Sequence, residues 1–239
     1  MALPFFYIEP LANEDMIVVL NEENSKHTVQ VLRMTEGEQL NLVDGLGTIY
    51  TAEIVDAHKK KCTIKIIQTA KQERGPKSVC IAVSPIKNNS RFEWFLEKAT
   101  EMGVTEIVPL LSDRTEKQHL KFDRLKGILI SAMLQSQQAW LPVLHEPIKF
   151  SQFVKENSST DKFIAHCEES QKNSLKEILI KSTNQPTNSS SILIGPEGDF
   201  TKEEIALALE NNYLPVALGD TRLRTETAAL VATTLLCIN

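Results

Sequence analysis

Two glycine-bearing loops carry the residue types best suited to holding a polar ligand. The first, residues 194–200, reads Ile-Gly-Pro-Glu-Gly-Asp-Phe and follows an apolar stretch. Gly195 and Gly198 permit tight turns and a close approach of backbone to ligand, and Pro196 stiffens the loop. The second, residues 219–227, reads Gly-Asp-Thr-Arg-Leu-Arg-Thr-Glu-Thr and also follows an apolar stretch. Either loop alone could be a structural turn, but the pair suggests a pocket for a polar ligand.

The pattern of glycines narrows the class of ligand. The chain contains no Gly-x-x-x-x-Gly-Lys phosphate loop and no Gly-x-Gly-x-x-Gly dinucleotide fingerprint. Nucleoside triphosphates and dinucleotides usually require one of these patterns. Both ligand classes are therefore disfavoured.

The elements that must position these loops alternate between strands and helices. Short apolar runs predict strands, and an apolar face recurring every three or four residues predicts helices. The predicted strands are 79–84, 104–111, 163–167, 191–194 and 214–218; the predicted helices are 91–102, 123–139, 172–181, one beginning after Thr201, and 226–237. Such alternation indicates a mostly parallel sheet covered on both faces. Ligands bind beyond the carboxyl ends of such strands, where both loops should lie.

The N-terminal part has a different pattern of predicted elements, in which strands dominate. Strands are predicted at 16–20, 39–43, 49–55 and 62–67, with one helical insertion at 25–33, which together suggest a small β-barrel-like module. Residues 71–77 are polar and contain Gly-Pro, as linkers often do. We therefore expect two domains, residues 1–72 and 73–239.

Composition sets the broad class. Apolar residues make up 42% and charged residues 24% of the 239 residues, which is typical of a globular protein. The four cysteines lie far apart, with no spacing suited to a metal, so they are expected to be free thiols. Neither a signal peptide nor a membrane-spanning run is evident, which predicts a cytoplasmic protein without a membrane partner.

Charge argues against nucleic-acid binding when it is counted over the whole chain. The formal net charge is −5, whereas nucleic-acid-binding domains usually show a basic footprint. Cations do gather between Arg114 and Lys126 and at Lys59–Lys61. Either group could form a local RNA contact or an ordinary solvated surface.

Three sequence features resemble one family closely. Residues 192–198 (Ile-Leu-Ile-Gly-Pro-Glu-Gly), 218–219 (Leu-Gly) and 223–228 (Leu-Arg-Thr-Glu-Thr-Ala) are similar to the C-terminal motifs of the SPOUT, or trefoil-knot, methyltransferases. The last motif is typical of the 16S rRNA uracil-N3 methyltransferase family. Residues 27–33 resemble that family's N-terminal PUA-like module, and residues 97–109 resemble its first knot-domain helix and strand.

The sequence departs from that family pattern at two places. Asp199 stands where the family usually has a second glycine. Residues 134–139 lack the arginine that the family usually carries before Pro142, although Gln135 and Ser136 persist.

The resemblance implies an α/β protein, α+β overall, with a PUA-like β-barrel RNA-binding domain before a SPOUT trefoil-knot domain whose sheet is mostly parallel. It implies S-adenosyl-L-methionine as the methyl donor and no metal. The cofactor would be bound, largely through backbone groups, by Ile194, Gly195, Pro196, Glu197, Gly198, Leu218, Gly219, Leu223, Arg224, Thr225 and Thr227.

Uracil N3 carries a weakly acidic proton that must be removed for methyl transfer, and an arginine near the carbonyl oxygens would favour the anion. The resemblance makes Arg224 the candidate, with Glu226 orienting it or acting as base. Alternatively, this pair only caps the last helix. Arg33, Arg91 and Arg114 are candidates for RNA contacts, or else ordinary surface arginines.

The resemblance further implies 16S rRNA of the small ribosomal subunit as the partner, and a homodimer. Two other functions remain open. One is a non-catalytic RNA-binding factor in ribosome assembly; the other is a methyltransferase of the same fold that acts on another RNA target.

Overall fold

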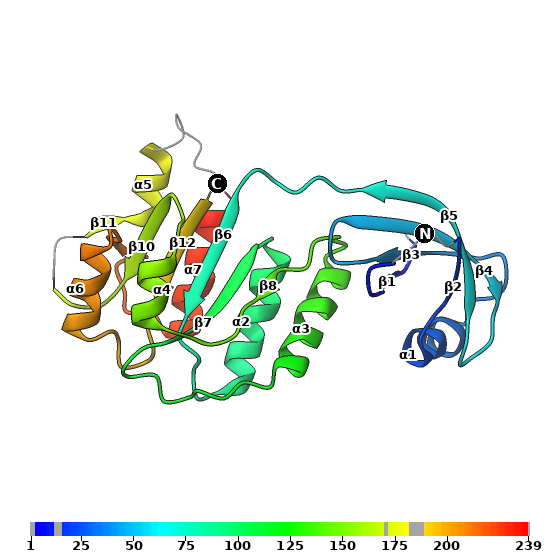
Figure 1. Cartoon of the computed structure of the whole chain (residues 1–239), viewed down its shortest axis with the longest axis horizontal. Helices are drawn as coiled ribbons and strands as arrows, with labels where there is room; N and C mark the ends of the chain where they lie inside the picture. Colours follow the sequence, from blue (N-terminus) through cyan, green and yellow to red (C-terminus); the bar gives the residue numbers. More distant parts are fainter. Residues whose placement is uncertain (1–2, 12–15, 170–171, 182–188, 239) are drawn as a thin grey trace. The chain divides into compact units, whose positions relative to one another are not determined.

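The structure is a computed structural model that describes residues 3–11, 16–169, 172–181 and 189–238. The chain divides into two compact units (Figure 1). The first unit combines Met1–Arg74 with Met133–Leu141, and the second combines Gly75–Ala132 with Pro142–Asn239. The expected division after residue 72 places 133–141 in the large domain, whereas the structure groups this segment with the N-terminal unit.

The first unit is built on a sheet that, within the described residues, has five strands in the order β1-β3-β4-β5-β2. The strands are β1 (Phe5–Tyr7), β2 (Ile17–Val19), β3 (Gln39–Val43), β4 (Thr48–Asp56) and β5 (Thr63–Lys71). β1 and β3 are parallel, and the remaining pairs are antiparallel. Alternate residues such as Leu40, Leu42, Ala52, Ile54 and Ile64 face a common core. The four strands predicted here are confirmed; β1 was not predicted, because its three residues lie between Pro4 and Pro10.

The helical insertion is also present. It consists of α1 (Glu22–Lys26), which runs directly into a π-helical turn, η1 (His27–Val31). Asn21 caps α1, because its side chain accepts a hydrogen bond from the backbone N–H of Asn24 at 2.8 Å. Arg33 then adopts a φ of 57°, which ends the helical run.

The segment 133–141 continues α3 (Phe122–Gln135) and contributes to the core of the first unit. Met133 and Ala139 pack against Val43 in a buried cluster. The helix predicted to reach residue 139 ends at Gln135, because Gln137 has a φ of 55° that a right-handed helix cannot accommodate. The prediction followed the apolar periodicity past the point where the backbone turns.

The second unit is built on a parallel sheet. Its order within the described residues is β11-β13-β10-β12-β6-β7-β8, with β9 paired to β7. The strands are β6 (Ser78–Val83), β7 (Glu106–Leu111), β8 (Val143–Leu144), β9 (Ile148–Lys149), β10 (Asp161–Ala165), β11 (Asn173–Ser174), β12 (Ser189–Ile194) and β13 (Leu214–Ala217). Every described pair is parallel, which confirms the predicted sheet.

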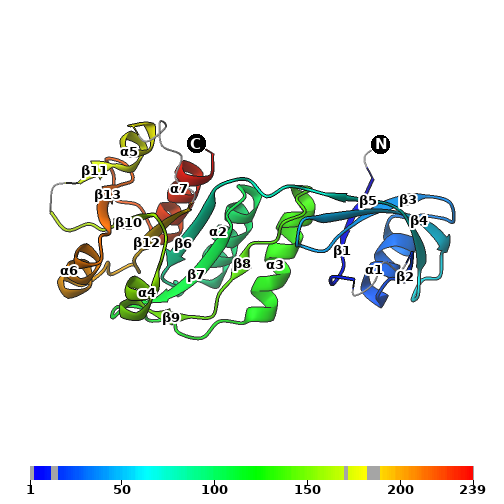
Figure 2. The ribbon, with the colours of Figure 1, turned by 45° about the horizontal axis from the view of Figure 1, so that its top comes forward.

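Helices cover both faces of this sheet (Figures 1 and 2). They are α2 (Asn89–Glu101), α4 (Phe150–Glu156), α5 (Leu175–Lys181), α6 (Lys202–Glu210) and α7 (Thr225–Cys237). α4 and α6 share a buried apolar cluster with β6, β7, β10 and β12. α7 packs on β6, β12 and α2. The sequence pattern did not predict α4, nor the strands β8, β9 and β11, which have only two residues each.

The last strand, β13, and the helix that follows it, α7, lie at different positions along the sheet. β13 lies on the side of β10 away from β12, yet α7, which follows β13, packs against β12 and β6. The segment between β13 and α7 must therefore return across the carboxyl ends of β10 and β12. This return path fits the trefoil-knot topology that the resemblance implies.

Candidate functional site

A cavity of about 710 Å³ lies at the carboxyl ends of β10, β12 and β13. Its walls are the loops that follow these three strands and the start of α7. They comprise Ala165, His166, Cys167 and Lys172; Ile194, Gly195, Pro196, Glu197 and Asp199; Val216, Ala217, Leu218, Gly219, Asp220, Thr221, Arg222, Leu223, Arg224, Thr225 and Ala228. This is the edge at which open α/β sheets bind their ligands.

The cavity brings together most of the residues that the sequence singles out for cofactor binding. Ile194, Gly195, Pro196 and Glu197 come from the first loop, and Leu218, Gly219, Leu223, Arg224 and Thr225 from the second. Gly198 and Thr227 do not line it. The two motifs thus face one cavity, although the strands that they follow, β12 and β13, are separated in the sheet by β10.

Close packing explains the first glycine of the loop 194–200. A Cβ atom at Gly195 would lie 3.3 Å from the ring and the backbone nitrogen of Phe200. Phe200 is buried and packs against Phe150, with ring centroids 5.1 Å apart. The loop therefore folds back on itself over a buried aromatic ring, and any larger residue at position 195 would require Phe200 to shift slightly.

The same loop is held from outside by the segment that follows β7. Arg114 donates from Nη1 to the carbonyl oxygen of Gly198 at 2.6 Å. Next to it, the backbone N–H of Asp113 donates to Glu204 Oε1 at 2.9 Å, while Glu204 also forms a capping box with Thr201 at the start of α6. Arg114, predicted as an RNA contact, thus stabilises the cavity loop in this structure.

The start of α7 is tied to the first loop. Thr225, the first residue of α7, donates its hydroxyl to the carbonyl oxygen of Gly195 at 3.0 Å. Arg224 is the N-cap residue of α7, and its side chain is exposed at the cavity. Among the described residues its side chain has no hydrogen bond or ion pair, so its guanidinium can reach a ligand without losing an internal partner.

Glu226 has a different partner from the one expected. Its side chain is only 10% exposed, and a carboxylate oxygen lies 3.7 Å from Nε of Arg91, at the start of α2. In the described part of the chain, no ion pair joins Glu226 to Arg224, and Glu226 does not line the cavity. Arg91, predicted as an RNA contact, therefore pairs with the predicted catalytic carboxylate. Arg33, the third predicted RNA contact, is exposed in the N-terminal unit.

The third wall of the cavity follows β10, and the sequence did not single it out as a ligand site. Both ring nitrogens of His166 are buried and, among the described residues, without a hydrogen-bond partner. Burial and the nearby Lys172 ammonium lower the pKa of His166, so the ring is neutral at pH 7. A lone histidine more often has a structural role. The only feature of the sequence that pointed to a ligand site at His166 was its position at the end of a predicted strand.

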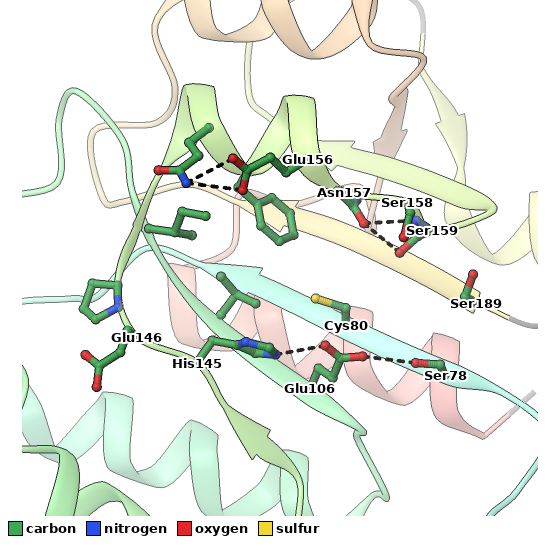
Figure 3. Close-up of a pocket in the computed structure, with 15 residues that line it drawn as sticks. Ser78, Cys80, Glu106, His145, Glu146, Glu156, Asn157, Ser158, Ser159 and Ser189 are labelled. Atoms are coloured by element: carbon green, nitrogen blue, oxygen red, sulfur yellow. Dashed lines mark hydrogen bonds and ion pairs between the residues drawn. The ribbon is translucent and has the colours of Figure 1, made fainter.

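A second cavity, of about 660 Å³, lies where the strands of the same sheet begin (Figure 3). Figure 3 shows His145 and Ser78 turned toward Glu106 from two sides; the His145 Nε2 to Glu106 Oε2 distance is 2.9 Å. Glu146 and Glu156 also line this cavity, and no lysine or arginine does. It is thus electrostatically unsuited to the phosphates of RNA.

The cysteines are free thiols, as the sequence predicts. Burial raises the pKa of Cys62, Cys80 and Cys237, which keeps these thiols protonated and unreactive. Within the described residues, no group of histidine, cysteine and carboxylate side chains could hold a metal ion. No described helix is both long and apolar enough to span a membrane.

Comparison with known proteins gives matches along nearly the whole chain. A family model described as an RNA methyltransferase domain matches residues 73–237, and one described as an RNA methyltransferase PUA domain matches residues 20–67. A ribosomal RNA small subunit methyltransferase E from Synechocystis is 31% identical over 90% of this chain and 71% of its own length.

Solved structures agree with these matches. A probable rRNA-methyltransferase from Porphyromonas gingivalis superposes with a TM-score of 0.89 at 34% identity, covering 99% of both chains. A ribosomal RNA small subunit methyltransferase E from Neisseria gonorrhoeae, bound to S-adenosyl methionine, gives a TM-score of 0.84 at 28% identity, covering 98% of this chain and 96% of the other.

Proposed function

The chain belongs to the RNA methyltransferase family, and we propose that it transfers a methyl group from S-adenosyl-L-methionine to N3 of a uracil in 16S ribosomal RNA. The observation that carries this proposal is the single cavity lined by both sequence motifs at the carboxyl edge of the sheet. The relatives named for small-subunit rRNA methylation support the substrate class. The Leu223–Ala228 motif supports N3 as the atom modified.

The cavity fits this cofactor. Its volume of about 710 Å³ falls in the range of small-molecule sites. Gly195 lines the cavity with backbone atoms alone, and the buried ring nitrogens of His166 have no protein partner among the described residues. When bound, S-adenosyl-L-methionine supplies an electrophilic methyl group, so the protein needs no covalent intermediate.

The protein's own contribution is then positioning and electrostatics. The two loops fix the cofactor through backbone groups, and alignment of reacting groups is itself a large source of rate. Arg224 would stabilise the negative charge that develops on the uracil oxygens as N3 gives its proton to solvent water. Glu226 acts as a positioning residue, because its pairing with Arg91 anchors the first turn of α7 to α2.

Three further features belong to the same proposal. The N-terminal unit, with Arg33 on its surface, contributes to RNA binding. The working form is a homodimer, and the site of action is the cytoplasm, where small ribosomal subunits are assembled. The resemblance to the uracil-N3 family is what supports these features.

The test is methyl transfer from labelled S-adenosyl-L-methionine to small ribosomal subunits that lack the modification, followed by nucleoside analysis. The proposal predicts N3-methyluridine in 16S rRNA. A 2′-O-methylated nucleoside, or label in transfer RNA alone, would reassign the target. RNA binding without cofactor binding or product would instead identify a non-catalytic assembly factor.

A further inference from the structure

Asp199 links two walls of the cavity. One carboxylate oxygen accepts a hydrogen bond from the backbone N–H of Cys167 at 2.7 Å, and the other accepts from the N–H of Phe200 at 2.9 Å. Cys167 follows β10, whereas Phe200 belongs to the loop that follows β12. The side chain thereby joins the two loops, and hydrogen bonds to an ionised acceptor are the stronger kind.

The backbone at Asp199 makes this contact possible. Its φ is 62°, a left-handed conformation that aspartate tolerates better than most residues. The resembling family usually has glycine at this position, which would adopt the same φ but offer no acceptor. Asp199 therefore adds a contact at a backbone conformation that glycine also adopts.

The wall that Asp199 holds contains His166. On the other side of this residue, the Lys172 ammonium donates to the carbonyl oxygens of His166 at 2.8 Å and Glu168 at 2.6 Å. The segment 166–168 is thus held by Lys172 at its first and last carbonyl oxygens, and by Asp199 at the backbone N–H of Cys167 between them. His166, whose buried imidazole has no hydrogen-bond partner among the described residues, is therefore part of a wall that both side chains hold.

We propose that Asp199 is a positioning residue that preforms the cofactor cavity by holding the loop after β10 against the loop after β12. This inference rests on the proposed function, because it assigns the cavity to S-adenosyl-L-methionine. Its physical basis is preorganisation: a wall that is already ordered loses less conformational entropy when the cofactor binds. Asp199 itself need not touch the reacting atoms.

Glycine and asparagine substitutions at position 199 change the hydrogen bonds of the Asp199 side chain while keeping its positive φ. Asp199→Gly keeps the positive φ and removes both acceptors, whereas alanine would add strain at this φ. Asp199→Asn keeps one acceptor oxygen. Asn212→Gly is the matched control, because Asn212 has a φ of 66°, is exposed and does not line the cavity.

Calorimetric titration with S-adenosylhomocysteine, together with methyl-transfer kinetics, gives the readouts. We expect Asp199→Gly to raise the cofactor Kd and KM about tenfold, the size of one charge-assisted hydrogen bond, with kcat at saturating cofactor within about twofold. Asp199→Asn should lie between the glycine variant and the wild type. Asn212→Gly should bind as the wild type does.

The outcomes distinguish this inference from the proposed function. If the wild type binds no cofactor, the proposed function fails. If the wild type binds and Asp199→Gly binds equally well, only the role of Asp199 is overturned. The role of Asp199 is also overturned if Asn212→Gly loses as much affinity as Asp199→Gly does. A fall in kcat with an unchanged KM would overturn it as well, since neither result follows from preorganisation of the cavity.

Discussion

Arginine side chains around the cavity differ in whether they already have a partner. Arg91 pairs with Glu226, and Arg114 donates to the carbonyl oxygen of Gly198. Arg224, among the described residues, has no such partner. The sequence indicated all three as candidate functional cations. It could not show which of them bind another part of the protein, because their partners lie far away in the chain.

The Arg91–Glu226 pair can be tested by a double-mutant cycle with Arg91→Ala and Glu226→Gln. The carboxylate is nearly buried while the guanidinium is half exposed, so we expect a coupling free energy of about 0.5–1 kcal/mol in chemical unfolding. If the two changes prove additive and Arg91→Ala instead weakens binding to ribosomal subunits, Arg91 is the RNA contact that the sequence predicts.

His166 should make stability depend on pH. Burial, followed by the Lys172 charge, lowers the pKa of the folded ring, while Asp199 and Glu168 oppose this effect. The unfolded chain takes up a proton near the ordinary pKa of about 6.5, and the folded chain does so only at lower pH. Below about pH 6.5 the unfolded state therefore binds more protons, and the free energy of unfolding falls as the pH falls.

The variant His166→Gln keeps a polar side chain that does not titrate. Its free energy of unfolding should therefore fall less than that of the wild type between pH 7.5 and pH 5.5, as measured by urea denaturation at each pH. Parallel losses in the two proteins would show that His166 does not titrate differently in the folded state.

At the scale of elements, most of the sheet could be predicted and its connections could not. The strands of both units follow from short apolar runs, and the glycine-rich strand ends located the cavity. The helix after Phe122 was extended too far because apolar periodicity continues beyond the turn at Gln137. The wall after β10 was missed because it is defined by a hydrogen bond that Asp199 accepts and one that Lys172 donates, rather than by a motif.

Gly47 shows how one turn depends on a segment distant in sequence. Its φ is 91°, and a Cβ atom would overlap the indole of Trp140, whose Nε1 donates to the carbonyl oxygen of Gln72 at 3.0 Å. Gly47→Ala therefore combines a conformational cost with a steric one, and we expect a loss of roughly 2–4 kcal/mol in the free energy of unfolding.

Gly37→Ala is the matched control for this change. Gly37 has a similar φ of 86°, but a Cβ atom there meets nothing within 4 Å. It should lose only the conformational part, about 1–2 kcal/mol. Equal losses for Gly37→Ala and Gly47→Ala in the same unfolding experiment would refute the close contact with Trp140.

At the scale of the molecule, the two family matches fall mainly in different units, but residues 133–141 lie in the match to the RNA methyltransferase domain and in the first unit. Met133–Leu141 begins in the last turn of α3 and supplies Met133 and Ala139 to the core of the first unit. Cutting the chain at the linker, residues 71–77, would therefore remove part of the core of the first unit.

The net charge of −5 argued against an RNA partner. It is compatible with one because RNA recognition depends on local cations rather than on the total charge of the chain.

The most direct test of the central claim compares the wild type, Arg224→Lys and Arg224→Ala in methyl transfer to unmodified small ribosomal subunits. Because the cofactor is expected to contact the backbone here, S-adenosylhomocysteine should bind all three within about threefold. Arg224→Ala should lower kcat by about 10²–10³-fold, with Arg224→Lys intermediate because it keeps the charge but not the planar fork. Undiminished transfer by Arg224→Ala would contradict the account.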